Sequence, residues 1–507
     1  MNNSKNSKKK KQTKQLTTGQ NLVRVLKSKR FGIALATIEL VLSVVLIGML
    51  MYLNILPLKY FLPAAIALLV IGAYLMCCMF LKKFRGFAKV IAFILSIIMA
   101  VGIYYVGYAN GTFDKIGGAD TKTDVVNVYV LKEDAASTIK DAAGYNFGIL
   151  GNLDKDNTEK TIEDINKEIK GNMTTTEKST IQDLVDVLYN GDVQAIIMNQ
   201  AYASAIKDVD GYTDFEDVTK VIYKKTIKTK INKAENIDVT NNTFTVFISG
   251  IDTDGAVSTT SRSDVNILAV INPDTKEILL INTPRDYYVP LSISNGVPDK
   301  LTHAGIYGVN VSMDTLGLLY DTDVNYYFRL NFTGFTGIID ALGGITVHSD
   351  YAFTTLHGGD QIVAGDNYLS GTQALGFVRE RYSLSGGDNQ RGKNQMAMIS
   401  AVVKKMASPA ILNNYAGLMN SISDSFETSL SSAQISSLVR MQLNEGGAWN
   451  VQQYAVTGTG DSAGCYSLAS GTNAYVMRPN VTTVEKAKEL INNVYNGEAI
   501  SATDVAQ

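Results

Sequence analysis

Three long apolar runs near the start of the chain constrain its folding more than any other feature. Phe31–Ile55, Tyr60–Leu81 and Val90–Ala109 consist mostly of apolar residues. Each holds about twenty residues, which is enough to cross a bilayer as a helix. The first run is too long for a removable signal peptide and lacks the small-residue cleavage pattern. We therefore predict three transmembrane helices within residues 31–109.

The positions of Lys and Arg predict how these helices are oriented. The first thirty residues carry ten Lys and Arg and no Asp or Glu, and Lys82, Lys83, Arg85 and Lys89 follow the second span. Basic segments stay on the cytoplasmic side of a membrane. We expect residues 1–30 to form a cytoplasmic arm, and everything after Ala109 to lie outside the cell. The arm shows no helix-turn-helix pattern and is too short for a DNA-binding domain, so no nucleic-acid partner is expected.

Glu39 is the one acidic residue inside the first span. An ionised carboxylate at membrane depth costs several kcal/mol. Two interpretations remain open: the side chain is protonated, or it faces a partner helix.

After the spans, short β-branched runs alternate with helical patterns, which is typical of α/β folds. Residues 110–124 are expected to form a linker, and residues 125–232 a small accessory α/β domain without a catalytic set. Its strands are predicted at Val126–Leu131, Phe147–Leu150, Val193–Met198 and Val218–Ile222, and its helices at Ala135–Ala143, Thr161–Ile169 and Thr180–Tyr189.

A second α/β domain is predicted over residues 241–497, with a mixed sheet flanked by helices, and residues 498–507 are expected to form a frayed tail. Two strands that are apolar on both faces are predicted to be central and buried. Pro273-Asp274-Thr275 between them is a turn signal, which predicts a hairpin. The strands are predicted at Thr243–Ile251, Val265–Asn272 and Glu277–Thr283, and the helices at Val311–Leu319, Phe332–Leu342 and Gln390–Met406.

The hairpin predicts a meeting of charged residues at its open end. Asp264 lies ten residues before Asp274 and Arg285 lies eleven after it, so the two should come together. Asp252 directly follows the preceding strand. Two carboxylates are then able to converge on one hard cation, and oxygen ligands of this kind suit Mg²⁺.

A second charged cluster follows in the segment Phe377–Tyr382. Interpreted as a strand, this segment places Arg379 and Arg381 on one face. Asp388 is a plausible N-cap of the next helix, and Arg391 would sit in its first turn. A cation there opposes the helix dipole unless an anion binds beside it. Gln395, one turn on, faces the same way.

Several Arg, at least two Asp and no nucleophilic Ser-His or Cys-His pattern together indicate phosphoryl transfer. Guanidinium groups bind phosphate through two hydrogen bonds. Phosphoryl transfer depends on charge stabilisation and positioning more than on covalent help. Any one of these residues alone would be an ordinary surface ion pair. Lys300 and His303 are further candidates to lie near the site.

Six short segments of the second domain resemble the LytR–CpsA–Psr family of wall-polymer ligases. The likeness covers residues 241–407 well and the remainder more loosely. The three spans and the accessory domain look like the capsule-associated members found in Gram-positive bacteria. The segments are Ser249–Asp252, Ser261–Asp264, Thr283–Asp286, Asp340–Ile345, Val378–Tyr382 and Gly387–Arg391 with Gln395 downstream.

The resemblance implies a membrane-bound phosphotransferase. It would take a glycan from a polyprenyl-pyrophosphate carrier, join it to a peptidoglycan sugar hydroxyl and release polyprenyl phosphate. Membrane lipids and capsule-assembly membrane proteins are further implied partners, and the plasma membrane is the implied location. By motif match Asp252 and Asp264 would hold Mg²⁺, Asp388 would orient or assist, and Arg262, Arg285, Arg379, Arg381, Arg391 and Gln395 would bind the pyrophosphate.

Two points stay open at this stage. The attacking hydroxyl needs a base, and Asp252, Asp264 and Asp388 are unranked candidates for it. A non-catalytic module that binds the lipid-linked polysaccharide, and so regulates capsule length, export or expression, fits the spans and the accessory domain equally well.

Overall fold

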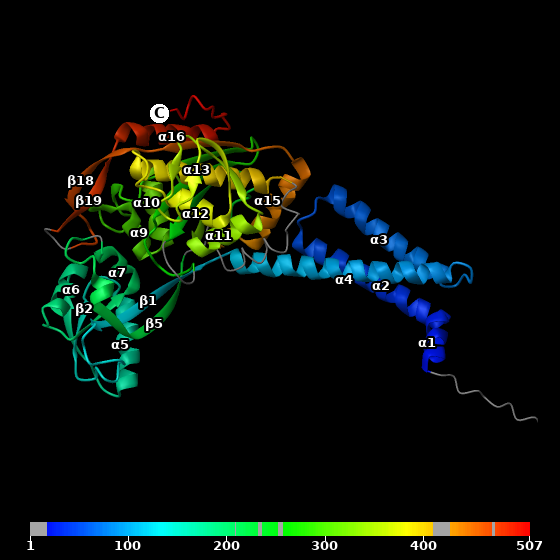
Figure 1. The fold of residues 1–507 in the computed structure, drawn as a ribbon, viewed down its shortest axis with the longest axis horizontal. Coiled ribbons are helices and arrows are strands. Elements are labelled where there is room, and N and C mark those ends of the chain that lie inside the picture. Colours follow the sequence, from blue (N-terminus) through cyan, green and yellow to red (C-terminus); the bar gives the residue numbers. More distant parts are fainter. Residues whose placement is uncertain are drawn as a thin grey trace, which may run out of the picture. The chain divides into compact units, whose positions relative to one another are not determined.

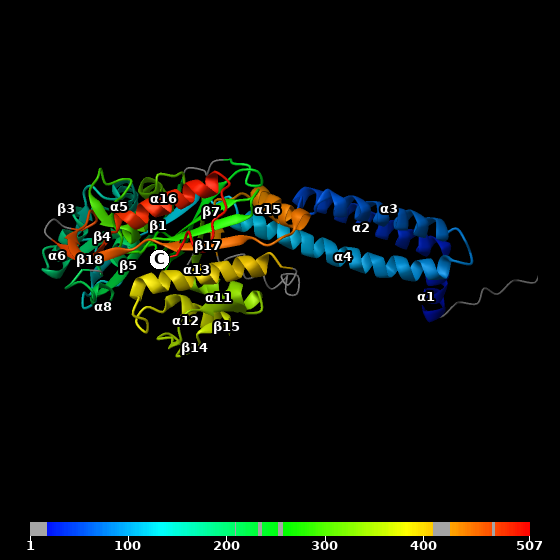
Figure 2. The same ribbon diagram turned by 90° about the horizontal axis from the view of Figure 1, so that it is seen from above.

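The computed structural model describes residues 18–207, 209–231, 236–251, 257–408, 426–468 and 472–506. The chain forms two compact units, Met1–Asn110 and Gly111–Gln507. Figures 1 and 2 draw the same ribbon from two directions. The boundary between the two units lies within a long helix, Arg85–Ile116.

The first unit consists of helices, and each of the three predicted spans coincides with a long helix. In the part of the chain that the structure describes, three helices are long and apolar enough to cross a membrane. The third continues past Ala109, so the expected linker shrinks to the few residues before the first strand. The helices are α1 (Thr18–Lys27), α2 (Lys29–Leu53), α3 (Leu58–Cys78) and α4 (Arg85–Ile116).

Glu39 is buried between α2 and α3. Its side chain is fully covered, and one carboxyl oxygen accepts a hydrogen bond of 3.2 Å from the hydroxyl of Ser43. A methyl group at Gly72 of α3 would lie 3.0 Å from the other oxygen. The carboxyl therefore faces a neighbouring helix of its own chain.

The accessory domain is built on a five-stranded mixed sheet with the order β3-β2-β4-β1-β5. Helices α6 and α7 cover one face, and α5 covers the other. β3 escaped prediction because it is an edge strand of exposed polar residues without alternating apolar positions. The elements are β1 (Thr121–Leu131), β2 (Asn146–Leu150), α5 (Lys155–Ile169), β3 (Thr174–Lys178), α6 (Ile181–Tyr189), β4 (Ala195–Asn199), α7 (Gln200–Ile206), α8 (Phe215–Val218) and β5 (Thr219–Lys230).

The predicted helix Ala135–Ala143 is wrong, because this segment forms a series of turns. Asp134 accepts a hydrogen bond from the backbone N–H of Ala136 at 2.7 Å. The carboxylate of Asp141 accepts two more, from the residues three and four positions before it. Acidic side chains that bind nearby backbone groups in this way compete with the helical hydrogen bonds.

The C-terminal domain, which follows β5, is built on a six-stranded mixed sheet with the order β16-β11-β6-β7-β8-β17. The predicted hairpin is confirmed, with Asn272 paired to Glu277 across the turn. The elements that frame the sheet are β6 (Phe244–Ile251), β7 (Val265–Asn272), β8 (Glu277–Asn282), α9 (Leu301–Tyr307), α10 (Val309–Tyr320), β11 (Tyr326–Asn331), α11 (Phe332–Ala341), α12 (Gly371–Arg379), α13 (Gly387–Met406), β16 (Phe426–Thr428), α15 (Ser432–Glu445), β17 (Asn450–Ala455) and α16 (Val481–Tyr495).

Short strand pairs complete this domain at its edges. They are β9 (Tyr288–Pro290) with β10 (Pro298–Lys300), β12 (Ile345–Ser349) with β15 (Gly365–Leu369), β13 (Phe353–Thr354) with β14 (Gln361–Ile362), and β18 (Gly458–Gly464) with β19 (Asn473–Pro479).

Strands β7 and β8 bury both of their faces, as their composition predicts. Leu268 and Leu279 point into a core that α10 and α16 close. Ala269 and Leu280 point into the core on the other side, where Met396 of α13 packs. Figure 2 shows α16 and α13 on opposite sides of these strands. The domain is therefore a layered α/β fold with a mixed central sheet.

The C-terminal tail is packed against the domain, so the expectation of a frayed tail does not hold for its first part. Ile500 is 2% exposed and belongs to the core beneath α16. Its carbonyl oxygen accepts a hydrogen bond of 3.0 Å from the side chain of Asn450.

The accessory and C-terminal domains share one hydrophobic core. Tyr202 and Ile206 of α7 pack in the same cluster as Ile306 of α9 and Cys465. Burial raises the pKa of the Cys465 thiol to about 12. A thiol held protonated in an apolar setting is chemically inert, so Cys465 serves to pack this junction.

Backbone contacts strengthen the same junction. Thr123 of β1 donates its N–H to the carbonyl oxygen of Ser258 at 2.9 Å, and its own carbonyl accepts from Thr260 at 2.8 Å. The ammonium group of Lys122 lies 3.1 Å from the carbonyl oxygen of Tyr307. The accessory domain therefore contacts two segments of the C-terminal domain, residues 258–260 and α9. Both segments adjoin a cluster of charged residues.

We expect Ile206→Val in the accessory domain to destabilise both domains together. Ile206 is fully buried in the shared core, and an Ile→Val change in a core costs about 1 kcal/mol. The measurement is denaturant unfolding of the purified chain, followed by far-UV circular dichroism and by the fluorescence of Trp449. This residue is the chain's single Trp and packs in the C-terminal domain.

The exposed Val221 supplies a matched control. It is 46% exposed on β5, so Val221→Ala should change stability by less than about 0.5 kcal/mol. A shift of the dichroism signal that leaves the Trp449 transition unmoved would show that the two domains unfold independently.

Candidate functional site

The open end of the β7–β8 hairpin brings Asp264 and Arg285 together, as the spacing of the sequence predicts. The Nη1 atom of Arg285 lies 2.9 Å from Oδ1 of Asp264. Thr302, the second residue of α9, donates its hydroxyl to the same oxygen at 3.3 Å. Both charged side chains are mostly buried, with 16% and 18% of their surface exposed. This pair is the centre of the candidate site.

A second ion pair joins this centre from helix α13. The Nη2 atom of Arg391 lies 2.5 Å from Oδ1 of Asp388 and 3.5 Å from the backbone oxygen of Asp264. Asp388 is not the N-cap, because α13 begins at Gly387 and its cap is Gly386. It lies inside the first turn instead, where its negative charge interacts favourably with the positive end of the helix dipole and stabilises the helix.

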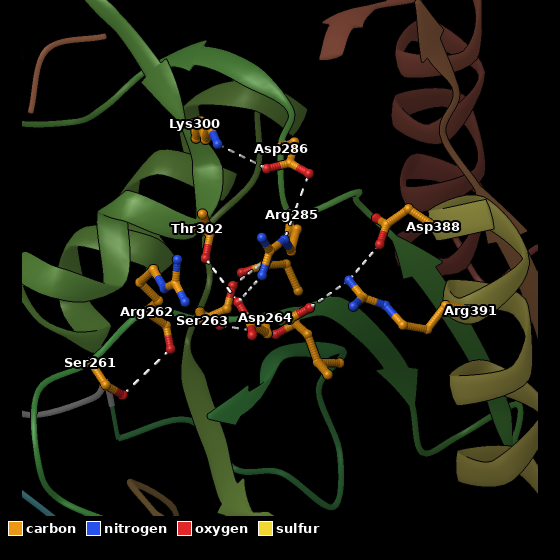
Figure 3. A network of polar contacts seen from close by, with 12 residues as sticks. Ser261, Arg262, Ser263, Asp264, Arg285, Asp286, Lys300, Thr302, Asp388 and Arg391 are labelled. Carbon is orange, nitrogen blue, oxygen red and sulfur yellow. Dashed lines mark hydrogen bonds and ion pairs between the residues drawn. The ribbon is translucent and has the colours of Figure 1, made fainter. Parts of the chain in front are cut away.

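Figure 3 shows that these residues form one connected network at the end of the sheet. Asp286, beside Arg285, lies 3.6 Å from the Nε atom of that arginine and 3.4 Å from the ammonium group of Lys300. Lys300 is 3% exposed. Lys300 therefore lies at the site, as the sequence predicted. His303, by contrast, is fully buried and pairs at 2.7 Å with Asp299.

The segment that carries Arg262 is held by groups that sequence reasoning missed. Arg329 of β11 is 3% exposed and donates to the carbonyl oxygen of Thr259 at 2.7 Å and to the hydroxyl of Ser261 at 3.1 Å. Gly305 of α9 lies so close that a methyl group there would be 2.5 Å from the carbonyl oxygen of Ser261. The isolated Arg within the apolar run Tyr326–Leu330 was the sequence signal that could have identified Arg329.

The predicted strand Phe377–Tyr382 is wrong. Helix α12 occupies this stretch up to Arg379, and Arg381 lies in the turn that follows. Ser370 and Gln373 form a capping box at the start of α12. The Ser-x-x-Gln pattern was therefore the sequence signal for a helix. The two arginines therefore do not share a strand face. They lie on either side of Glu380, at the corner formed by residues 379–383.

Arg379 lies at the same end of the sheet as Asp264. Its guanidinium carbon is 4.3 Å from the centre of the Phe332 ring. Phe332 directly follows Asn331, which pairs with Ile251 at the end of β6. Arg381 stacks less closely, at 5.7 Å, on the exposed ring of Tyr382.

Gln395 binds the end of α12. Its amide donates to the carbonyl oxygen of Val378 at 3.2 Å, and Asn394 donates to that of Phe377 at the same distance. The last carbonyl groups of a helix lack partners within the helix. These two amides supply them, so they fix the end of α12 on α13. A direct contact from Gln395 to a substrate remains a prediction.

Asp252 lies outside the described residues, so the predicted pair of metal ligands is only half visible. Gly250 pairs with Val265 in the sheet, which places the end of β6 beside Asp264. Among the residues that the structure describes, no three His, Cys, Asp or Glu side chains are grouped as a metal site. The oxygen atoms of Asp264 are nevertheless the ligand type that Mg²⁺ prefers.

The network combines three carboxylates with four cationic side chains over a short length of sheet edge. In Figure 3, Arg285, Lys300 and Arg391 each contact a carboxylate of Asp264, Asp286 or Asp388, and Arg262 lies beside them. Cations that are already ordered by neighbouring carboxylates are preorganised to bind a polyanion. The arrangement is chemically suited to gripping a phosphate or diphosphate group.

Known proteins are similar to this domain in sequence. The curated relatives include polyisoprenyl-teichoic acid–peptidoglycan teichoic acid transferase TagU of Enterococcus faecalis, which is 33% identical over 219 residues, or 42% of this chain and 71% of the relative. The protein of the same name from Halalkalibacterium halodurans is 30% identical over 220 residues, or 43% of this chain and 70% of the relative. The solved structure of Bacillus subtilis TagV matches with a TM-score of 0.43 and 21% identity, over 51% of this chain and 99% of that one.

Two family models match the chain. The one described as DNA polymerase processivity factor matches residues 82–198, a minor part that assigns no family. The one described as the LytR_cpsA_psr family matches residues 208–488, which is more than half of the chain and includes every described residue of the charged network. The chain therefore belongs to the LytR_cpsA_psr family.

Proposed function

We propose that this protein is a membrane-anchored phosphotransferase that moves a glycan from a polyprenyl-pyrophosphate carrier to a sugar hydroxyl of peptidoglycan. One observation carries the proposal: Arg285 and Arg391 reach the same residue, Asp264, at the end of the sheet. The printed names of the relatives describe transfer of teichoic acid from a polyisoprenyl carrier to peptidoglycan, which supports the same reaction class here. A capsular or other wall polysaccharide is the proposed cargo.

In the proposed reaction the acceptor hydroxyl oxygen attacks the phosphorus atom that carries the glycan. The bond from that phosphorus to the bridging oxygen of the diphosphate breaks as the new phosphodiester bond forms. Polyprenyl phosphate leaves, and the hydroxyl proton passes to a base. Asp252, Asp264 and Asp388 remain the candidates for that base.

The cationic side chains would bind the diphosphate from different elements of the fold. Arg285 and Arg391 would bind the diphosphate oxygens as negative charge grows on the leaving group, which is where preorganised donors lower a barrier most. Arg262 would bind the same group from the segment braced by Arg329. Arg379 and Arg381 would bind it from the end of α12. Asp264 and Asp388 hold two of these arginines in place before the donor arrives.

Mg²⁺ is the proposed cofactor, with Asp264 and Asp252 as its ligands. Asp264 presents carboxylate oxygens beside the end of the strand that Asp252 follows. When bound, Mg²⁺ would neutralise part of the diphosphate charge. The chain's own arginines would still orient the donor.

We further propose that the accessory and C-terminal domains lie outside the plasma membrane of a Gram-positive bacterium. The basic residues before α2 and between α3 and α4 support this orientation. A donor anchored in the outer leaflet would then be held near the site by its own lipid.

The direct test is turnover by the full-length protein in lipid nanodiscs. We expect release of polyprenyl phosphate from a polyprenyl-pyrophosphate oligosaccharide when peptidoglycan glycan fragments and Mg²⁺ are supplied. Mass spectrometry should detect the released lipid and the glycan phosphodiester in equal amounts. EDTA should stop the reaction and added Mg²⁺ should restore it.

Two results would count against this function. Tight binding of the donor without release would favour the non-catalytic binding module. Undiminished turnover in EDTA would leave the transfer reaction standing and remove Mg²⁺ from it.

A further inference from the structure

Glu380 is an acidic residue set between two arginines that are proposed to bind a diphosphate. In the sequence Arg379-Glu380-Arg381 its charge would be expected either to neutralise the arginines or to repel the ligand. In the structure its carboxylate binds backbone N–H groups instead. Glu380 is 1% exposed, and in the described part of the chain it forms no ion pair with Arg379 or Arg381.

The Glu380 carboxylate accepts four backbone hydrogen bonds. Its Oε1 atom accepts the N–H groups of Arg381, Tyr382 and Ser383, each at 2.9 Å. Its Oε2 atom accepts the N–H of Leu356 at 2.6 Å. A carboxylate with several backbone donors is strongly favoured in its charged form.

The pKa of Glu380 reflects this arrangement. Burial acts to raise it, but the hydrogen bonds from Ser383, Leu356 and Tyr382 together lower it below the ordinary value for a Glu. The side chain therefore stays ionised at neutral pH, and the backbone N–H groups that donate to it stabilise its charge.

The corner that Glu380 organises is otherwise lightly held. Glu380 is the C-cap of α12 and has extended backbone angles, so the helix stops there. Of the corner residues, only Arg379 belongs to α12. Tyr382 and Ser383 are exposed. The hydroxyl of Ser383 adds one bond, at 2.8 Å, to the carbonyl oxygen of Thr354.

Two separate parts of the chain meet on this one side chain. Leu356 belongs to the segment between β13 and β14, and the other three donors belong to the turn between α12 and α13. The carboxylate thus ties the turn that carries Arg381 to a loop more than twenty residues earlier. We propose that Glu380 is a positioning residue, which fixes the corner that presents Arg379 and Arg381 to the donor diphosphate while keeping its own charge away from that ligand. This inference rests on the proposed function.

The first test is Glu380→Gln in the full-length protein in nanodiscs. The glutamine amide has nearly the same shape as the carboxylate, but its NH2 group would face one of the backbone N–H donors. Because two donors cannot bind each other, the corner should be held less firmly. We expect the KM for the lipid-linked donor, and the inhibition constant of inorganic pyrophosphate, to rise about tenfold, the cost of a modest misplacement of binding groups. The value of kcat should change much less, because the lost contact is mainly one of ground-state binding.

A double-variant comparison separates positioning from general damage. If Glu380 acts through Arg381, adding Glu380→Gln to Arg381→Ala should raise the inhibition constant of pyrophosphate little further, since coupled residues are not additive. Full additivity with both Arg379→Ala and Arg381→Ala would overturn the proposal. So would an unchanged pyrophosphate constant in Glu380→Gln.

Asp141→Asn is the matched control, because Asp141 also accepts backbone N–H groups but lies in the accessory domain. It should leave the pyrophosphate constant unchanged. Ser383→Ala serves if Glu380→Gln does not fold: it removes one bond from the same corner and should raise the constant severalfold, and no rise would overturn the proposal. Absence of turnover in the wild-type protein would instead count against the proposed function, so the two failures are distinguishable.

Discussion

Arg285→Ala is expected to lower kcat/KM for glycan transfer by about 10²–10³-fold, the typical cost of removing one preorganised donor from a site of developing charge. Arg285 contacts two carboxylates of the network. It lies 2.9 Å from Asp264 and 3.6 Å from Asp286. Its removal takes away the guanidinium group at the centre of the site. It also leaves the carboxylate of Asp264 without its principal cationic partner, which adds repulsion toward an anionic donor.

Arg285→Lys refines this prediction. Lysine keeps the charge but presents a compact ammonium group without the planar pair of donors. We expect an intermediate loss, because the electrostatic part is retained and the bidentate geometry is not. The assay is the initial rate of polyprenyl phosphate release over a range of donor concentrations, with circular dichroism to verify folding.

Arg478 provides the matched control for the Arg285 variants. It also pairs with a carboxylate, that of Asp461, but 55% of its side chain is exposed. Exposed pairs contribute little to stability, so Arg478→Ala should transfer glycan at the wild-type rate. Near-normal transfer by Arg285→Ala would contradict the assignment of this network as the reaction centre.

The central part of this site was predictable because it follows from a hairpin. Strands that are apolar on both faces and a Pro-Asp-Thr turn fix the pairing of β7 with β8. That pairing in turn fixes which residues meet at the open end. Asp264 and Arg285 therefore could be placed together by counting from the turn, and the structure confirms their contact. Side chains paired by local strand geometry are the part of a site that a sequence reveals most directly.

The arginines after residue 377 could not be placed in this way. Their positions depend on Glu380, whose partners include Leu356 in a separate loop. They also depend on the Asn394 and Gln395 amides of the next helix. A period-two pattern in a short segment is compatible with both a strand and the end of a helix. The capping box of Ser370 and Gln373 was the sequence signal that favoured the helix, but the placement of the arginines at its end depends on tertiary partners.

Asp388 and the segment Ala135–Ala143 failed for a more local reason. In the segment Ala135–Ala143, acidic side chains bind nearby backbone N–H groups and so compete with the helical hydrogen bonds. Helix α13 begins three residues before the predicted start at Gln390, so Asp388 lies inside its first turn and pairs with Arg391. In the accessory domain, Asp134 and Asp141 replace a helix by turns.

Helix α9 was absent from the sequence-based fold, yet it supports the site from behind. It is only seven residues long, too short to show a helical period. Thr302 donates to Asp264, and its carbonyl oxygen accepts from the N–H of Ser263 at 3.3 Å. Ile306 packs in the core shared with the accessory domain. The helix is therefore fixed on one side by the accessory domain and touches the site on the other.

Gly305→Ala is expected to lower kcat/KM by about 10²-fold, because a shift of about 1 Å in catalytic groups has a cost of that order. A methyl group at Gly305 would lie 2.5 Å from the carbonyl oxygen of Ser261 and 2.8 Å from the N–H nitrogen of Ser263. Both neighbours are backbone atoms, which cannot rotate away as a flexible side chain can. Either α9 or the segment that carries Arg262 must move.

Gly144→Ala is the control for Gly305→Ala, because no atom lies within 4 Å of a methyl group built there. It should leave transfer unchanged. The two explanations of a loss in Gly305→Ala predict different kinetics. Displacement of Arg262 and Asp264 should lower kcat/KM while the Trp449 unfolding transition stays near its wild-type midpoint. A transition that moves with the activity would instead show that α9 matters for folding. Wild-type activity with an unshifted midpoint would mean that the close packing of α9 on this segment has no part in the reaction.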